Sequence, residues 1–466
     1  MFEETVCIDL GASYTKVALR GVCEPKRTGI LEQEAKILMV DNSPLIPSLA
    51  IHTRDNRQPW VFGWAAANMN PSKSMEVFLN WKADLFLPGN NKDSASAVTV
   101  AGKFFEWLKS RIESAGVNLK KCQTRVAMPA FRNFDDQAML IARCMDLSGW
   151  DDPSLVLKVT EPRANVLGLF SGGRNVVGRN RDGELLPNYG RMFGQQNVYI
   201  QAARGFVLQG GHGNLVNVMV VDIGAFTTDM ASLTFDITDI SDGLSAIRQE
   251  SHALGVINEL DKPLFAALGA RHGVSFSDLS FRDCEYLKRS LYNGTPYFLL
   301  TRSNGKDVTV ELGDAKDVEL VEEITGKFAD AIWKRIGSMI GEQKPERVFL
   351  TGGGSLIQPI ASALKASFNR RRIFVQDVQQ DSNAVGADIW RSWKDTGEGL
   401  QRLATALGGA NVIPQESASI IYDGENKAHR RQPIVVEPPQ GYTTCRCQGG
   451  NKDCCFCGGR GFCVSN

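Results

Sequence analysis

The chain has 466 residues, of which 43% are hydrophobic and 22% are charged, and these values are ordinary for a globular protein of about two to four domains. Lys and Arg together number 52, as do Asp and Glu, so charge favours neither a nucleic acid nor an anionic membrane surface as a partner. The first residues are acidic where a secretory signal is basic, and no apolar stretch is long enough to cross a membrane. We therefore expect a cytoplasmic protein without membrane contact.

Two stretches of the chain repeat one pattern of strand, turn and strand. Residues 6–20 carry it first, with a buried apolar run before a turn at 11–13. Residues 218–233 carry it again, with the turn at 224–225. Similar units this far apart predict an internal duplication that gives two related α/β lobes.

The rest of the chain alternates between helical and extended patterns. Periodic apolar residues predict helices at 101–115, 135–147 and 320–340, and the last is followed by a strand at 347–350. A stretch rich in Gly, Arg and Asn is expected to be an insertion, and a polar, proline-containing stretch is expected to be a linker. The expected domains are a first lobe at 1–169, a second lobe at 170–390 with the insertion at 171–213, a return helix to the first lobe at 391–413, the linker at 414–440 and a C-terminal module at 441–466.

Each hairpin turn has residue types that suit a phosphate group. Glycine lets the backbone approach closely, turn amides form an anion-binding nest, hydroxyls add donors, and a carboxylate at the strand end can hold Mg²⁺ through water. A third glycine turn follows the strand at 347–350 and suits ribose and the α-phosphate. One such turn alone is typical of ordinary loops, but three in this order predict a nucleotide clamped between two lobes. The residues concerned are Asp9, Gly11, Ala12, Ser13, Tyr14 and Thr15 in the first turn, Asp222, Gly224, Ala225, Thr227 and Thr228 in the second, and Gly352, Gly353, Gly354 and Ser355 in the third.

Together with several further segments, these turns resemble the Hsp70 proteins of the actin, Hsp70 and sugar-kinase ATPase superfamily. The resemblance covers residues 5 to about 410, except for 171–213. The segments are 46–51, 60–67, 70–71, 80–82, 126–131, 160–164 and 284–291. The resemblance implies duplicated RNase H-like lobes with an interlobe nucleotide cleft. Lys82 matches the Hsp70 catalytic lysine and Glu161 its catalytic glutamate, while Glu285, Lys288 and Arg289 match the helix that holds adenine and ribose.

This resemblance implies a Mg²⁺-dependent ATPase that binds ATP and ADP and turns over slowly. Asp9 and Asp222 would hold Mg²⁺, Lys82 would orient the attacking water, and Glu161 would position it or act as a base. The chain departs from the family at Phe226, where Hsp70 proteins have glycine, at Leu356, where they have an arginine that packs on adenine, and at Tyr292, where they have serine. Because no peptide-binding β-domain follows, we expect a chaperone-like switch for a protein client or partner rather than a general foldase.

The last residues carry a separate chemical signal. Five of the 11 cysteines are scattered between Cys7 and Cys284, and the other six lie after residue 444, which favours one metal site over a disulfide framework. This segment resembles a DnaJ-type cysteine-rich repeat, and so short a stretch needs metal to fold. The expected Zn²⁺ ligands are Cys445, Cys447, Cys454 and Cys457, with Cys455 or Cys463 as a possible replacement. We expect this zinc finger to contact a protein rather than a nucleic acid.

Two other functions fit parts of the sequence. An actin-like filament-forming ATPase would share the nucleotide turns, although the segments at Glu161 and at 285–289 favour Hsp70. A small-molecule kinase would need an aspartate in the cleft as a base for a substrate hydroxyl, and the sequence gives no candidate for it.

Overall fold

The structure of the protein is a computed structural model. It describes residues 4–22, 31–53, 59–86, 91–131, 134–150, 157–171, 174–179, 185–187, 215–236, 248–276, 279–303, 306–340, 344–376, 378, 398–410, 442–444 and 462–464. The chain divides into two compact units, Met1–Ile421 and Tyr422–Asn466. The expected linker at 414–440 and all four expected zinc ligands lie outside the described residues.

The larger unit contains two mixed sheets that have the same strand order. In the first, β1 (Glu4–Asp9) pairs antiparallel with β2 (Tyr14–Val22) and β2 with β3 (Leu31–Ile37), while β8 (Cys122–Met128) and β9 (Leu157–Thr160) continue parallel on the other side of β1. In the second, β12 (Leu215–Ile223), β13 (Thr228–Asp236) and β14 (Arg248–His252) are antiparallel, and β17 (Arg347–Thr351) and β18 (Phe374–Gln376) are parallel to β12. The expected α/β class is therefore confirmed.

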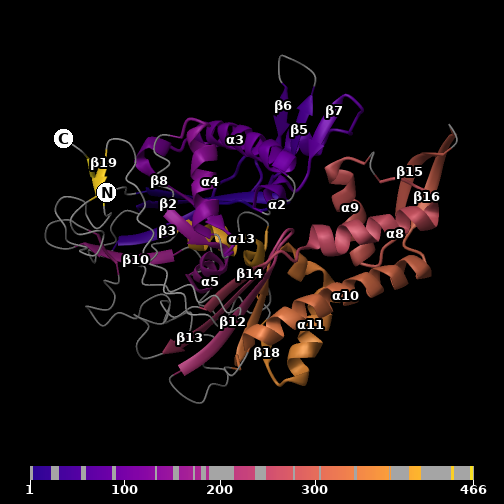
Figure 1. Cartoon of the computed structure of the whole chain (residues 1–466). Helices are drawn as coiled ribbons and strands as arrows, with labels where there is room; N and C mark the ends of the chain where they lie inside the picture. The colour runs from indigo at the N-terminus through magenta and orange to yellow at the C-terminus, as the bar shows by residue number, and fades with distance from the viewer. Residues whose placement is uncertain are drawn as a thin grey trace. The chain divides into compact units, whose positions relative to one another are not determined.

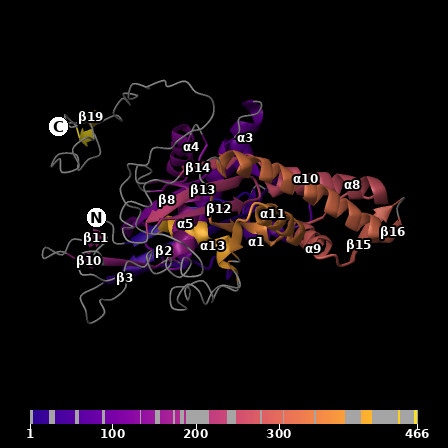
Figure 2. The ribbon, with the colours of Figure 1, turned by 90° about the horizontal axis from the view of Figure 1, so that it is seen from below.

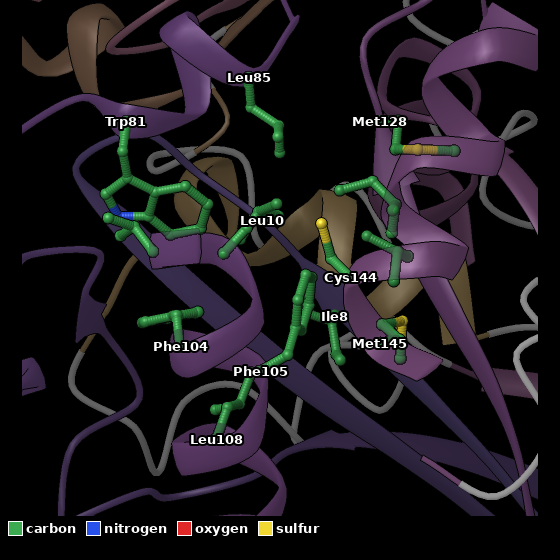
Figure 3. Packing of buried hydrophobic residues seen from close by; sticks show 14 of the residues in the cluster. Ile8, Leu10, Trp81, Leu85, Phe104, Phe105, Leu108, Met128, Cys144 and Met145 are labelled. Carbon is green, nitrogen blue, oxygen red and sulfur yellow. The ribbon is translucent and has the colours of Figure 1, made fainter. Parts of the chain in front are cut away.

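Helices cover both faces of each sheet, because the central strands are apolar on both sides. On β1, Val6 and Ile8 face the core beneath α2 (Trp81–Phe86), α3 (Asn91–Ser114) and α4 (Phe134–Asp146), as Figure 3 shows for Ile8. Cys7 faces the opposite side, toward α5 (Glu161–Ser171) and α13 (Leu400–Ala410). The second sheet shares α5 and α13 and is covered on its outer face by α10 (Ala315–Ile340) and α11 (Gln358–Arg370) (Figure 1). Helices α3, α4 and α10 confirm the helical stretches expected from periodicity.

The two shared helices, α5 and α13, approach each other unusually closely. A Cβ atom added at Gly168 would collide with the backbone of Ala404, and one added at Gly408 would collide with the backbone of Ala164. Glycine is therefore required at both positions, because the neighbouring backbone occupies the space of a side chain. This contact fixes the layer between the two sheets.

Each sheet carries a smaller accessory part. The first has β5 (Ala50–Thr53), β6 (Trp60–Phe62), β7 (Met75–Phe78) and the short helix α1 (Gly63–Ala67), and β4 (Ile46–Pro47) pairs with β2. The second has α8 (Lys262–His272), α9 (Phe281–Tyr292), β15 (Tyr297–Ser303) and β16 (Lys306–Leu312), gathered at one end of α10 (Figure 2). Phe281 of α9 packs on the apolar cluster of the first accessory part. The two accessory parts are therefore in contact.

The stretch 171–213 differs from the insertion expected in the second lobe. Its described residues include β10 (Arg174–Arg179), which pairs with β3, and β11 (Leu185–Pro187), which pairs with β10. These strands extend the first sheet rather than the second. They cover β3, which would otherwise be an exposed sheet edge.

The smaller unit contains one described antiparallel pair, β19 (Tyr442–Thr444) with β20 (Phe462–Val464). This pairing brings together the two ends of the cysteine-rich segment. Among the described residues of the whole chain, no helix is both long and apolar enough to cross a membrane.

Candidate functional site

A cavity of about 540 Å³ in the larger unit is lined by residues from both sheets. Its wall contains the β1–β2 turn, the β12–β13 turn, the glycine turn after β17, one face of α9 and the first turns of α13. Most of the residues expected from the sequence line it: Asp9, Gly11, Ala12, Ser13, Tyr14, Lys82, Glu161, Asp222, Gly224, Ala225, Thr227, Glu285, Lys288, Arg289, Gly352, Gly353 and Gly354. The structure thus brings segments from across the chain to one cavity.

Three expected residues, Thr15, Thr228 and Ser355, are not among those that line the cavity. The hydroxyl of Thr15 lies 2.8 Å from that of Ser48, and Thr228 Oγ1 donates to the carbonyl of Leu254 at 2.6 Å. Ser355 Oγ donates to the carbonyl of Gly352 at 2.7 Å. These hydrogen bonds hold the three turns in shape.

The buried pair of Lys82 and Glu161 forms part of the cavity wall. Lys82 Nζ lies 2.5 Å from Glu161 Oε1, and the two residues are 3% and 6% exposed. Trp81 anchors the start of α2 by donating its indole N–H to the carbonyl of Ser48 at 2.7 Å. Burial raises the pKa of Glu161, and the ammonium group of Lys82 opposes that increase. A glutamate in this setting can hold or accept a proton near neutral pH.

Carboxylates gather at the end of the cavity where β1 and β12 finish. Lys16 Nζ donates to Asp9 Oδ2 at 2.7 Å, and Asn165 Nδ2 donates to Asp222 Oδ2 at 2.6 Å. Burial raises the pKa of Asp222 to about 7. The positive charge of Lys16 partly offsets this increase, and the negative charge of Asp9 adds to it. Burial therefore disfavours the ionised carboxylate by more than its cationic and hydrogen-bonding neighbours offset.

Asp229 is a further cavity residue that the sequence reasoning did not assign. It lies opposite Asp222 in the β12–β13 register, as Lys16 lies opposite Asp9 in the β1–β2 register. Burial and the neighbouring charge of Asp222 raise the pKa of Asp229 to about 6. Both of its oxygens accept hydrogen bonds, from Thr227 and from Ser251. The repeated register was a signal that could have identified this residue.

The α9 side of the cavity carries a polar network that includes Glu285 and Lys288, and Arg289 also lines the cavity there. Lys288 Nζ forms ion pairs with Glu285 and, at 3.0 Å, with Asp261 Oδ2. Tyr292, the departure from serine, donates its hydroxyl to Asp261 Oδ1 at 2.8 Å. Across the cavity, the hydroxyl of Tyr14 lies 3.4 Å from Glu285 Oε2. Asp261 has no local sequence signal, because it lies before α8 and meets α9 only in the folded chain.

The other two departures have different consequences. Phe226 is 2% exposed and packs with the core of the first sheet, where its ring centroid lies 6.1 Å from that of Phe131. It therefore anchors the second turn to the opposite sheet. Leu356 is 43% exposed and lines the cavity. Further cavity residues that the sequence reasoning missed include Lys16, Asn293, Glu398, Gln401, Arg402 and Thr405.

The donor set can be tested against the two expected metals. No group of three or more His, Cys, Asp or Glu side chains within the described ranges is arranged to hold a metal ion directly. Asp9 and Asp222 still fit a hydrated Mg²⁺, because such an ion uses one or two carboxylates together with water and substrate phosphates. Their crowding with Glu161 and Asp229 provides the negative charge that a cation would offset. The four expected zinc ligands lie outside those ranges.

No protein-family model matches the chain, and no curated protein matches it.

Proposed function

We propose that the chain is a Mg²⁺- and ATP-dependent, Hsp70-like ATPase that acts as a nucleotide-driven switch for a protein client or partner. The observation that carries this proposal is the single cavity shared by both hairpin turns and the Lys82–Glu161 pair. The equal strand order of the two sheets supports the interpretation of duplicated RNase H-like lobes. A cavity of about 540 Å³ is also in the size range of small-molecule sites.

The residues of the cavity divide into two groups that suit the two ends of a nucleotide. The α9 residues and the glycine turn at 352–354 would hold the nucleoside, and the backbone of the two hairpin turns would hold the phosphates. Asp9 and Asp222 would hold Mg²⁺, which supplies neutralisation of phosphate charge when bound. Lys82 is buried and cationic, so it is suited to orient the attacking water and to offset charge that develops on the γ-phosphoryl group.

Hydrolysis on this arrangement needs few protein groups. The oxygen of a water molecule forms a bond to the γ-phosphorus, and the bond to the bridging oxygen breaks so that ADP leaves with the electron pair. Glu161 accepts a proton from the attacking water. The ion pair with Lys82 holds the Glu161 carboxylate in place for this transfer. We propose slow turnover, because the chain departs from the Hsp70 pattern at Phe226, Leu356 and Tyr292.

The smaller unit is proposed to be a zinc-binding module for partner contact. Thr444 pairs with Phe462, and Cys445, Cys447, Cys454 and Cys457 lie between these two residues in the sequence. Four thiols within so short a stretch of sequence support tetrahedral ligation of one Zn²⁺.

The catalytic part of the proposal is tested with Lys82→Met and Glu161→Gln, which keep side-chain size while removing charge. We expect each variant to lower ATP turnover by at least about tenfold, a barrier increase of about 1.4 kcal/mol, while ATP affinity changes by less than about threefold. Lys327→Met is a matched control, because Lys327 is an exposed lysine of α10 paired with Glu323. Normal turnover in both cavity variants would refute the assigned roles, and absence of ATP binding by the unaltered protein would refute the function.

A further inference from the structure

The first turn of α13 places two polar side chains in the cavity wall, at positions to which the sequence reasoning gave no role. Gln401 is 4% exposed, and its Oε1 atom has no hydrogen-bond partner. Its backbone carbonyl accepts from the N–H of Gly352 at 2.8 Å, so the residue lies beside the glycine turn. A buried oxygen without a partner destabilises the protein unless a water molecule or a ligand supplies a donor.

Arg402 lies next to Gln401 and faces the same cavity. Its guanidinium group is 2.8 Å from Glu398 Oε2 and 5.4 Å from the ring centroid of Tyr14, and its side chain is 14% exposed. The contacts with Glu398 and Tyr14 hold the group in place. A guanidinium group has more N–H donors than one carboxylate can accept, so it can also bind an anion. The positive end of the α13 dipole lies at the same turn and favours negative charge there.

These two neighbours demand different chemistry from one ligand. An ionised phosphate offers only acceptors, so it can satisfy Arg402 but not Gln401 Oε1. A sugar hydroxyl offers a donor and lies close to the phosphate in any sugar phosphate. We propose that the first turn of α13 recognises the sugar–phosphate part of the bound nucleotide: Gln401 accepts a hydrogen bond from a ribose hydroxyl, and Arg402 donates to the oxygens of an adjoining phosphate.

This inference rests on the proposed nucleotide function and adds its selectivity. The turn selects for ribose over deoxyribose through Gln401, and for nucleotides over nucleosides through Arg402. It also joins the ligand to α13, which packs along α5 between the two sheets. Gln401 and Arg402 are therefore specificity residues rather than parts of the hydrolytic machinery.

The test measures the affinities of ADP, adenosine and 2′,3′-dideoxyadenosine by calorimetry for the full chain and for Gln401→Leu and Arg402→Gln. We expect Arg402→Gln to weaken the binding of ADP by about tenfold and the binding of adenosine by less than about twofold. Gln401→Leu is expected to weaken the binding of ADP and of adenosine by about fivefold each, and to leave the affinity for dideoxyadenosine unchanged. Arg335→Gln, at an exposed arginine of α10, is the control and should bind all three ligands normally.

A second measurement separates ligand recognition from a structural role. Without ligand, Gln401→Leu should raise the unfolding temperature, because the substitution removes a buried oxygen that lacks a partner. A structural role would instead lower it. If the unaltered protein binds ADP and both variants bind it within about twofold of that affinity, this inference fails while the proposed function stands. If the unaltered protein binds none of the three ligands, the proposed function fails and this inference fails with it.

Discussion

Asp222→Asn tests the charge balance of the cavity. The carboxyl of Asp222 has a pKa of about 7 in the folded protein and 3.8 as its ordinary value, chiefly because of burial. Between these values the folded state keeps a proton that the unfolded state has released. The folded state therefore binds more protons there, and stability falls as the pH rises from about 4 to about 7. Asparagine has no such titration, so the variant should lack this loss.

The size of the effect follows from the two pKa values. They differ by about three pKa units, and one pKa unit corresponds to about 1.4 kcal/mol. The ionised carboxylate therefore lowers the free energy of unfolding at pH 8 by on the order of 4 kcal/mol. An unfolding entropy of about 2.1 cal/mol/K per residue gives about 0.9 kcal/mol/K for the larger unit. Asp222→Asn should therefore raise the unfolding temperature at pH 8 by about 4 °C. The pKa of Asp229 should fall as well, because the charge of Asp222 contributes to raising it.

The assay is thermal unfolding between pH 5 and pH 8, with chelator and without nucleotide, for the unaltered protein and the variant. The gap between their unfolding temperatures should widen as the pH rises. Asp330→Asn, which removes an exposed carboxylate of α10, is the control and should keep the pH dependence of the unaltered protein. Equal slopes for Asp222→Asn and the unaltered protein, or a variant that is less stable at pH 8, would show that the cavity does not hold an undercompensated carboxylate.

Three further predictions concern packing, ligand binding and metal. Gly408→Ala should destabilise the fold by about 1–3 kcal/mol or more in urea unfolding, because its Cβ would meet the backbone of Ala164, whereas Gly326→Ala, where a Cβ meets nothing within 4 Å, should not. ATP should slow hydrogen exchange at residues 11–15 and 224–228 together, and protection of only one turn would contradict a shared ligand. The purified chain should contain one Zn²⁺, which Cys457→Ser should release without loss of ATP binding; metal analysis that finds no zinc in the unaltered protein would refute the site.

The sequence predicted the parts of the fold whose signals are local. Apolar runs flanking glycine turns identified β1–β2 and β12–β13, and periodicity identified α4 and α10. The partners of these elements depend on contacts between distant residues, which no local pattern contains. Strand β10 is the clearest case, since its pairing with β3 places it in the first sheet although its sequence neighbours lead to the second.

The candidate site shows the same limit at the level of single atoms. The turn sequences identified segments that line the cavity, because glycine and a carboxylate at a strand end are recognisable locally. They did not reveal which hydroxyls face the cavity, since the partner of Thr15 is Ser48 and the partner of Thr228 is Leu254. The resemblance, rather than spacing, identified Lys82 and Glu161, because they lie 79 positions apart and no local pattern links them.

The two turns repeat in sequence but differ in the charge of the residue that faces the strand-end aspartate. In the first, Asp9 faces Lys16 and forms an ion pair within its own hairpin. In the second, Asp222 faces Asp229, so two carboxylates meet with no lysine between them in that hairpin. The carboxylates of the second turn therefore lack a lysine partner within their own hairpin. Phe226 of that turn is buried in the core of the first sheet, so the second turn packs directly against the opposite sheet.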